Sequence, residues 1–125
     1  MEPIRFYIPY PPQRKMPAFC KAYGLNAIYA GKHWSKRRED SQYWHMLVAN
    51  ELRRQGIPRK MFERPVGLHF WWNDRMDCSN HAYIGKMIED AIKGHIIQND
   101  SRRWVKSITH SFHDRDFIQV EVREV

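Results

Sequence analysis

The chain has 125 residues, 42% of them hydrophobic, which favours one folded domain over a disordered segment. Its two cysteines, Cys20 and Cys78, lie far apart and outside any ligand motif, which excludes a disulfide scaffold and a zinc knuckle. The formal net charge of +7 favours a polyanionic partner, typically nucleic acid, over a soluble protein that happens to be basic.

The N-terminal segment predicts a strand followed by a long loop. Apolar residues alternate with others from Ile4 to Ile8, which is typical of a half-buried strand, and Pro9 ends it. Residues 13–31 are expected to form a loop because proline and glycine interrupt them. Arg14 and Lys15 lie there among aromatic residues. Basic residues among aromatic residues suit contact with phosphates and bases. An alternative that explains the pattern equally well is that the aromatic residues belong to the core beneath the loop.

The first helix is predicted from Ser35, as its N-cap, to about Gln55. The densest basic run, KHWSKRR at 32–38, lies around its start. Positive charge is unfavourable at a helix N-terminus, so this run needs another explanation. It supplies the best candidates for phosphate contacts: Lys32, His33, Lys36 and Arg37.

The remaining elements complete an α+β domain with a mixed sheet and two main helices. Residues 66–72 are apolar on both faces, which predicts a central strand covered on both sides. A second helix is expected over residues 80–93. Two strands, at 104–111 and 117–125, are expected to pair as a hairpin through a turn at 113–116.

Neither a membrane segment nor a signal peptide is predicted. No apolar run reaches the ~20 residues needed to span a bilayer. The first residues also lack the apolar core of a secretory signal. We therefore expect a cytoplasmic protein that has no membrane partner.

The segment DCSNHAYIGKMIEDAIKGHIIQND, from Asp77 to Asp100, carries the candidate chemistry. Carboxylates that flank a helix following a strand can converge on one point. On a basic protein, this suggests a divalent metal and a phosphate substrate. Lys86, between them, can hold a phosphate or stabilise developing negative charge. Each residue also has a structural interpretation: the aspartates as turn or cap residues, and Lys86 as the i, i+4 partner of Asp90.

This segment resembles the catalytic segment of the RusA family of Holliday-junction resolvases, which is common in phages and prophages. Asp77 matches the first carboxylate of the family pattern, and Asn80 matches its asparagine. Lys86 matches the lysine of the family's helix. Gly94 matches the glycine, and Asn99–Asp100 the acidic pair. Ser79 stands where the family usually carries a second aspartate, and it can also cap the helix. The resemblance extends more loosely over the whole chain.

The resemblance implies a Mg²⁺-dependent endonuclease, with Mn²⁺ as an alternative ion, that resolves four-way DNA junctions by paired nicks during recombination and repair. Its metal ligands would be Asp77, Asp100 and Ser79, and its catalytic residues Asp77, Asp100 and Lys86. A four-way junction has approximate two-fold symmetry, so two matched nicks call for a homodimer.

Two alternatives stay open. One is a catalytically inactive protein that binds junctions and has lost a metal ligand at Ser79. The other is an unrelated RNA-binding domain. Cleavage of a synthetic junction with and without Mg²⁺ separates the enzyme from both, and competition by single-stranded RNA separates the two binding proteins.

Overall fold

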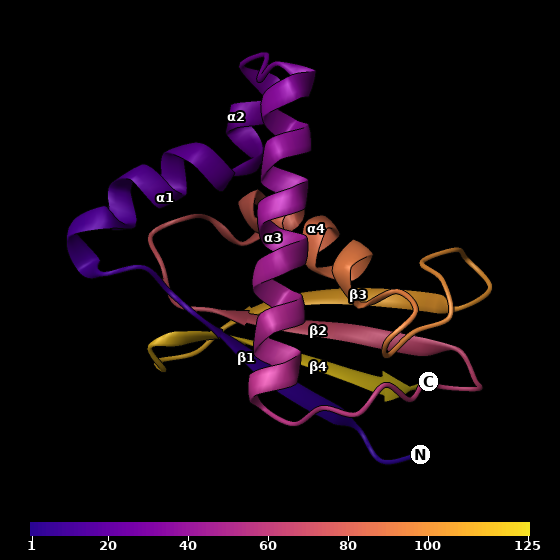
Figure 1. Ribbon diagram of the computed structural model, residues 1–125. Helices are drawn as coiled ribbons and strands as arrows, with labels where there is room; N and C mark the ends of the chain where they lie inside the picture. The colour runs from indigo at the N-terminus through magenta and orange to yellow at the C-terminus, as the bar shows by residue number, and fades with distance from the viewer.

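Four segments rich in apolar residues form one mixed sheet, and the helices lie together on one of its faces (Figure 1). The computed structural model describes residues 1–125. The α+β fold predicted from the sequence is confirmed. The elements in chain order are β1 (Ile4–Pro9), η1 (Gln13–Lys15), α1 (Met16–Tyr23), α2 (Leu25–Tyr29), α3 (Trp34–Arg54), β2 (Val66–Trp72), η2 (Cys78–His81), α4 (Ala82–Ile92), β3 (Val105–Phe112) and β4 (Phe117–Glu124).

The strand order is β1-β4-β2-β3, so β2 is a central strand, as predicted. It pairs in parallel with β3 through the α4 crossover, and antiparallel with β4. The predicted hairpin between the last two strands is wrong, because β4 occupies the other edge of β2 and pairs with β1 beyond it. The chain crosses the end of β2 to get there: the His113 N–H donates to the Trp72 carbonyl at 3.0 Å.

The core lies between the sheet and the helices. Ile84, Ile88 and Ile92 of α4 are fully buried, as expected for one face of a helix packed on a sheet. The second face of β2 is not covered by a helix, which corrects the prediction of a strand covered on both sides (Figure 1). On that face the rings of His69 and Trp71 stack with centroids 3.6 Å apart and stay half-buried.

The predicted loop over residues 13–31 is wrong, since it contains α1 and α2. The residues taken as breakers mark helix boundaries instead. Pro17 lies in the first turn of α1, where its missing N–H costs no helical hydrogen bond. Gly24 separates the two helices with an extended backbone, and Gly31 follows α2 with a φ of 93° that favours glycine.

The long helix α3 begins at Trp34, one residue before its predicted cap. His33 is the cap: its Nδ1 accepts a hydrogen bond from the Ser35 N–H at 3.1 Å. At the other end, Gly56 follows with a φ of 69°. None of the helices has both the length and the apolar character that crossing a membrane requires.

Replacing Ile88 with alanine should test the packing of α4. The side chain is fully buried, so we expect the free energy of unfolding in urea to fall by about 2–5 kcal/mol. Ile108→Ala, at a side chain that is 45% exposed on the edge strand, is the matched control and should cost less than about 1 kcal/mol. Equal losses at both positions would contradict this arrangement.

Candidate active site

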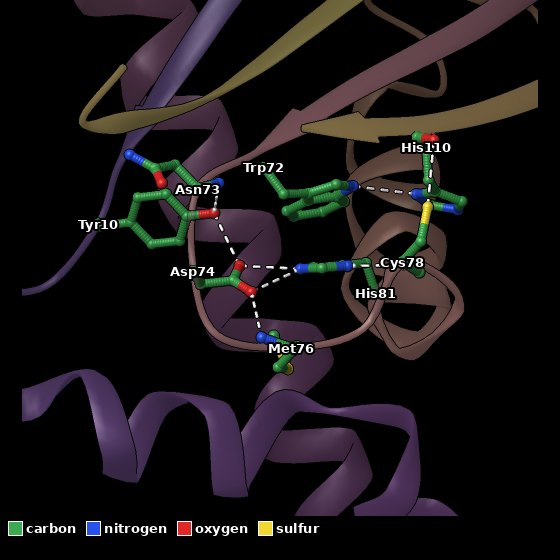
Figure 2. Close-up of polar contacts among 8 residues, drawn as sticks. All are labelled: Tyr10, Trp72, Asn73, Asp74, Met76, Cys78, His81 and His110. Atoms are coloured by element: carbon green, nitrogen blue, oxygen red, sulfur yellow. Dashed lines mark hydrogen bonds and ion pairs between the residues drawn. The ribbon is translucent and has the colours of Figure 1, made fainter. Parts of the chain in front are cut away.

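The loop after β2 is organised by the Asp74 carboxylate (Figure 2). The Tyr10 hydroxyl donates to Oδ2 at 2.8 Å, and the Met76 N–H donates to Oδ1 at 2.9 Å. His81 Nε2 lies 2.8 and 2.9 Å from the two oxygens. Asp74 therefore ties together the N-terminal segment, the loop itself and the start of the α4 region.

His81 forms a buried ion pair with Asp74. Its Nδ1 lies 3.0 Å from the Cys78 carbonyl, and its Nε2 faces the carboxylate. The Cys78 carbonyl and the Asp74 carboxylate therefore place a hydrogen-bond acceptor beside each ring nitrogen. Both side chains have zero exposure, and the Trp72 ring stacks on the imidazole with centroids 4.4 Å apart. This pair cannot meet a substrate, so its role is to position the loop.

The pKa of Asp74 agrees with this geometry. Burial by itself would raise the pKa, but hydrogen bonds from His81, Met76 and Tyr10 hold it below its ordinary value. The same burial raises the pKa of the Tyr10 hydroxyl far above its usual range. The Tyr10 phenol is therefore neutral and donates its hydrogen bond to an ionised Asp74 carboxylate. Sequence reasoning missed His81, for which a single sequence gives no signal.

Asp77 lies on the outer side of this loop, in a groove of about 980 Å³. Its carbonyl accepts a hydrogen bond from the Asn80 N–H at 3.0 Å, and Asn80 in turn accepts from the Asn26 N–H at 3.0 Å. Ser79 is exposed beside it and caps neither η2 nor α4, contrary to the expected N-cap. Basic and small residues line the groove, including Lys21, Lys32, Arg75, Ala22, Ala27 and Ala30.

Asp100 belongs to a second cluster, beside the exposed face of α4. Lys86 Nζ contacts the Asp100 carboxylate, lies 3.1 Å from Asp90 Oδ1 and lies 3.4 Å from Glu89 Oε1. Lys93 Nζ adds contacts at 3.4 Å to Asp90 and 3.6 Å to Asp100. One oxygen from each of the three carboxylates lies within 4.8 Å of the others, so this group can hold a metal ion.

The lysines set the ionisation of this carboxylate cluster. The hydrogen bond from Lys86 lowers the pKa of Asp100 to about 2, so Asp100 is ionised at neutral pH. Burial raises the pKa of Glu89, and the charge of Lys86 opposes that effect. Burial tends to lower the pKa of Lys86, but its bonds to Asp100 and Asp90 raise it above its usual range. A metal ion would therefore compete with a charged Lys86 for these oxygens.

Within one chain the structure does not bring Asp77 and Asp100 together. Helix α4 runs back along the sheet as the crossover between two parallel strands, and the two aspartates flank opposite ends of that unit. The helical rise from Ala82 to Asp90 alone is about 12 Å. The three predicted metal ligands therefore lie in two separate places. Asp77 and Ser79 lie at the groove, and Asp100 lies beside Asp90.

Glu89 was missed by sequence reasoning as a member of this group, although its i, i+3 spacing from Lys86 was a usable signal. Asp90 was taken as a structural partner of Lys86, and that ion pair is present at 3.1 Å. Its proximity to Asp100 could not be predicted, because it depends on how the segment after α4 folds back along the helix.

The predicted phosphate-binding residues occupy different environments. Lys32 is mostly buried, bridges to Asp40 and donates to the Ala22 carbonyl at 2.7 Å, so it joins α1 to α3. His33 is engaged as the α3 cap. The other four predicted residues are exposed: Arg14 and Lys15 in η1, and Lys36 and Arg37 at the start of α3.

Comparisons with known proteins assign no family to this arrangement. No protein-family model matches the chain, and no curated protein has a significantly similar sequence.

Asp74→Asn should destabilise the fold in a pH-dependent way, because it removes the ionised acceptor of the buried hydrogen bonds that join Asp74 to Tyr10, Met76 and His81. At pH 7 we expect a loss of about 3–5 kcal/mol in the free energy of unfolding. The folded pKa of Asp74 lies below the unfolded value of about 4, so its contribution is complete above that pH and is lost as pH falls through the folded pKa.

Urea denaturation between pH 7 and pH 2 measures this effect. The stability gap between the parent and the Asp74→Asn variant should narrow at acid pH. Asp114→Asn, in an exposed turn, controls for the general loss of a carboxylate and should show no gap at either pH. A gap that stays constant across the range would show that Asp74 carries no charge in the folded protein.

Proposed function

We propose that this chain is a metal-dependent endonuclease that cuts branched DNA, with Mg²⁺ held by Glu89, Asp90 and Asp100. The observation that carries the proposal is the meeting of three carboxylates within 4.8 Å around Lys86. Their oxygen donors fit Mg²⁺ or Mn²⁺ better than a softer metal. A bound ion would activate water and neutralise charge on the scissile phosphate.

Lys86 has a defined role in this proposal. Its side chain is 55% exposed, and its charge neutralises the carboxylates that a bound metal would neutralise instead. With the carboxylates engaged, Lys86 would turn to a phosphate oxygen and stabilise the negative charge that develops there. Removing Lys86 should therefore impair cutting, although it also removes a competitor for the carboxylates.

The surroundings of the cluster support a nucleic-acid substrate. One turn before Lys86, the Tyr83 hydroxyl donates to Asp40 of α3 at 2.7 Å, which joins the exposed face of α4 to the start of α3. Lys36 and Arg37 lie exposed in that first turn. A phosphate backbone crossing from α3 to α4 would meet basic side chains first and the carboxylate cluster next.

The resemblance of the Asp77–Asp100 segment to the RusA family supports a four-way junction as the substrate. Paired nicks on a two-fold symmetric junction call for two sites, so we propose a homodimer as the active form. Asp77 would then face DNA from the groove rather than share an ion with Asp100 of the same chain.

A second candidate is a protein that binds junctions and does not cut them. The observation in its favour is that Lys86 and Lys93 already neutralise most of the charge of the three carboxylates. Such an ion-pair network is stable without a metal. Ser79, a neutral residue at the position of a family carboxylate, points the same way.

Asp100→Asn should abolish Mg²⁺-dependent nicking of a synthetic four-way junction while binding of the junction persists. It removes charge from the proposed metal ligand and leaves the basic surface intact. Asp114→Asn, in an exposed turn, is the matched control and should cut like the parent. Mn²⁺ binding followed by electron paramagnetic resonance gives a readout that does not depend on activity. It should weaken at least tenfold in Asp100→Asn alone.

Two further variants locate the ion. Asp77→Asn and Ser79→Asp both lie outside the proposed metal set, so the Mg²⁺ concentration for half-maximal nicking should change less than twofold. Loss of cutting in Asp77→Asn, together with a lower Mg²⁺ requirement in Ser79→Asp, would place the ion in the groove instead. A parent that binds junctions but never cuts with Mg²⁺ or Mn²⁺ would favour the second candidate.

Replacing Lys36 and Arg37 with alanine should weaken DNA binding through lost phosphate contacts. Each contact adds about −0.9 to the slope of log K against log salt on duplex DNA, so the slope should flatten by about 2. Fluorescence anisotropy at several salt concentrations measures it, with Lys60→Ala, on an exposed connector, as the control. The nicking rate at saturating protein should stay nearly unchanged, and a collapse would assign these residues to catalysis.

A further inference from the structure

The turn between α2 and α3 exposes two large aromatic side chains. Tyr29, the last residue of α2, is 81% exposed, and Trp34, the first residue of α3, is 61% exposed. Figure 1 shows this turn at the end of α3 farthest from the sheet. Neither side chain belongs to the core, so neither is explained by the packing of the domain. We call residues 29–38 the tip.

The tip is an ordered structure. The Gly31 N–H donates to the Ile28 carbonyl at 3.0 Å, and the Lys32 N–H donates to the Ala27 carbonyl at 3.1 Å. The cap formed by His33 fixes the start of α3, and its ring lies against that of Trp34 with centroids 5.5 Å apart. Exposed rings on a preorganised backbone lose little conformational entropy when they bind a ligand.

The charges around these rings indicate an anionic ligand. Lys36, Arg37 and Arg38 follow Trp34 and are exposed, and no acidic residue occupies the first turn of α3. Lys36 lies 3.4 Å from Glu39 in an exposed i, i+3 pair, which contributes little, and the helix dipole disfavours cations at this end of α3. A bound phosphate would be stabilised both by these side chains and by the positive end of the helix dipole.

We propose that Trp34 and Tyr29 stack on unpaired bases at a DNA branch point, while Lys36 and Arg37 hold the flanking phosphates. Aromatic rings beside basic side chains suit single-stranded nucleic acid because every base offers a face for stacking. The inference rests on the proposed function for the identity of the nucleic acid, and it adds a base-contacting site remote from the carboxylate cluster. It would favour branched over fully paired DNA.

The test uses the full chain in EDTA, so that binding is measured without cleavage. The probe is a four-way junction with 2-aminopurine at the branch point, compared with a duplex of the same length. Trp34→Ala should reduce affinity for the junction about 5- to 150-fold, the range for loss of one stacked base. Duplex affinity should change less than twofold, and Trp34→Phe should recover most of the junction affinity.

Two further readouts separate stacking from charge and from folding. Trp34→Ala removes no charge, so its salt slope should equal that of the parent, whereas Lys36→Ala and Arg37→Ala flatten the slope. The parent should change the 2-aminopurine fluorescence, and Trp34→Ala should lose that change while keeping the parent's circular dichroism spectrum. Tyr29→Ala should give a smaller effect of the same kind.

The outcomes distinguish this inference from the proposed function. Equal losses of junction and duplex affinity in Trp34→Ala, or no loss at all, would overturn the stacking role even if the parent cuts DNA. Junction-selective loss in a parent that never cuts would leave the stacking role standing and reject the nuclease. A tip that binds phosphatidylserine vesicles and no DNA would be a membrane contact, and a parent that binds neither DNA probe would overturn both proposals.

Discussion

The buried ion pair between Asp74 and His81 is the interaction on which the arrangement of this protein depends. Two ionisable side chains with no exposure are tolerable only because each is hydrogen-bonded. Their partners come from three separate parts of the chain, since Asp74 also accepts from Tyr10 and from the Met76 N–H. The pair fixes the loop after β2, and the direction of α4 and the exposure of Asp77 follow from that loop.

The crossover helix then divides the acidic residues of the central segment. Because α4 returns along the sheet, Asp77 stays near the end of β2, while Asp100 meets Lys86 and Asp90 beside the later turns of the helix. The basic start of α3 adjoins the same helix through the Tyr83–Asp40 hydrogen bond. A carboxylate cluster, a basic helix end and the groove that contains Asp77 therefore surround one short helix, which is the physical basis for proposing a nuclease.

Periodicity in the sequence was sufficient for β1, α3, β2 and α4, whose apolar stripes are long and regular. It also located β3 and β4 as strands, but it did not give the partners of β4, which pairs with two strands distant in sequence. It failed between Met16 and Tyr29, where glycine and proline sit at helix ends. For the site, the i, i+4 pair of Lys86 and Asp90 was predictable, but the approach of Asp100 depends on non-local packing.

The position of β4 has a consequence for how the sheet assembles. Ile4 pairs with Val122, so β1 has no strand neighbour until nearly the whole chain is available. Closing so long a loop is entropically costly, and β1 should join the sheet late in folding. By the same connectivity, a fluctuation that detaches β4 must release β1 as well. β1 and β4 should therefore exchange their amide protons as one cooperative unit, while β2, β3 and α4 remain protected.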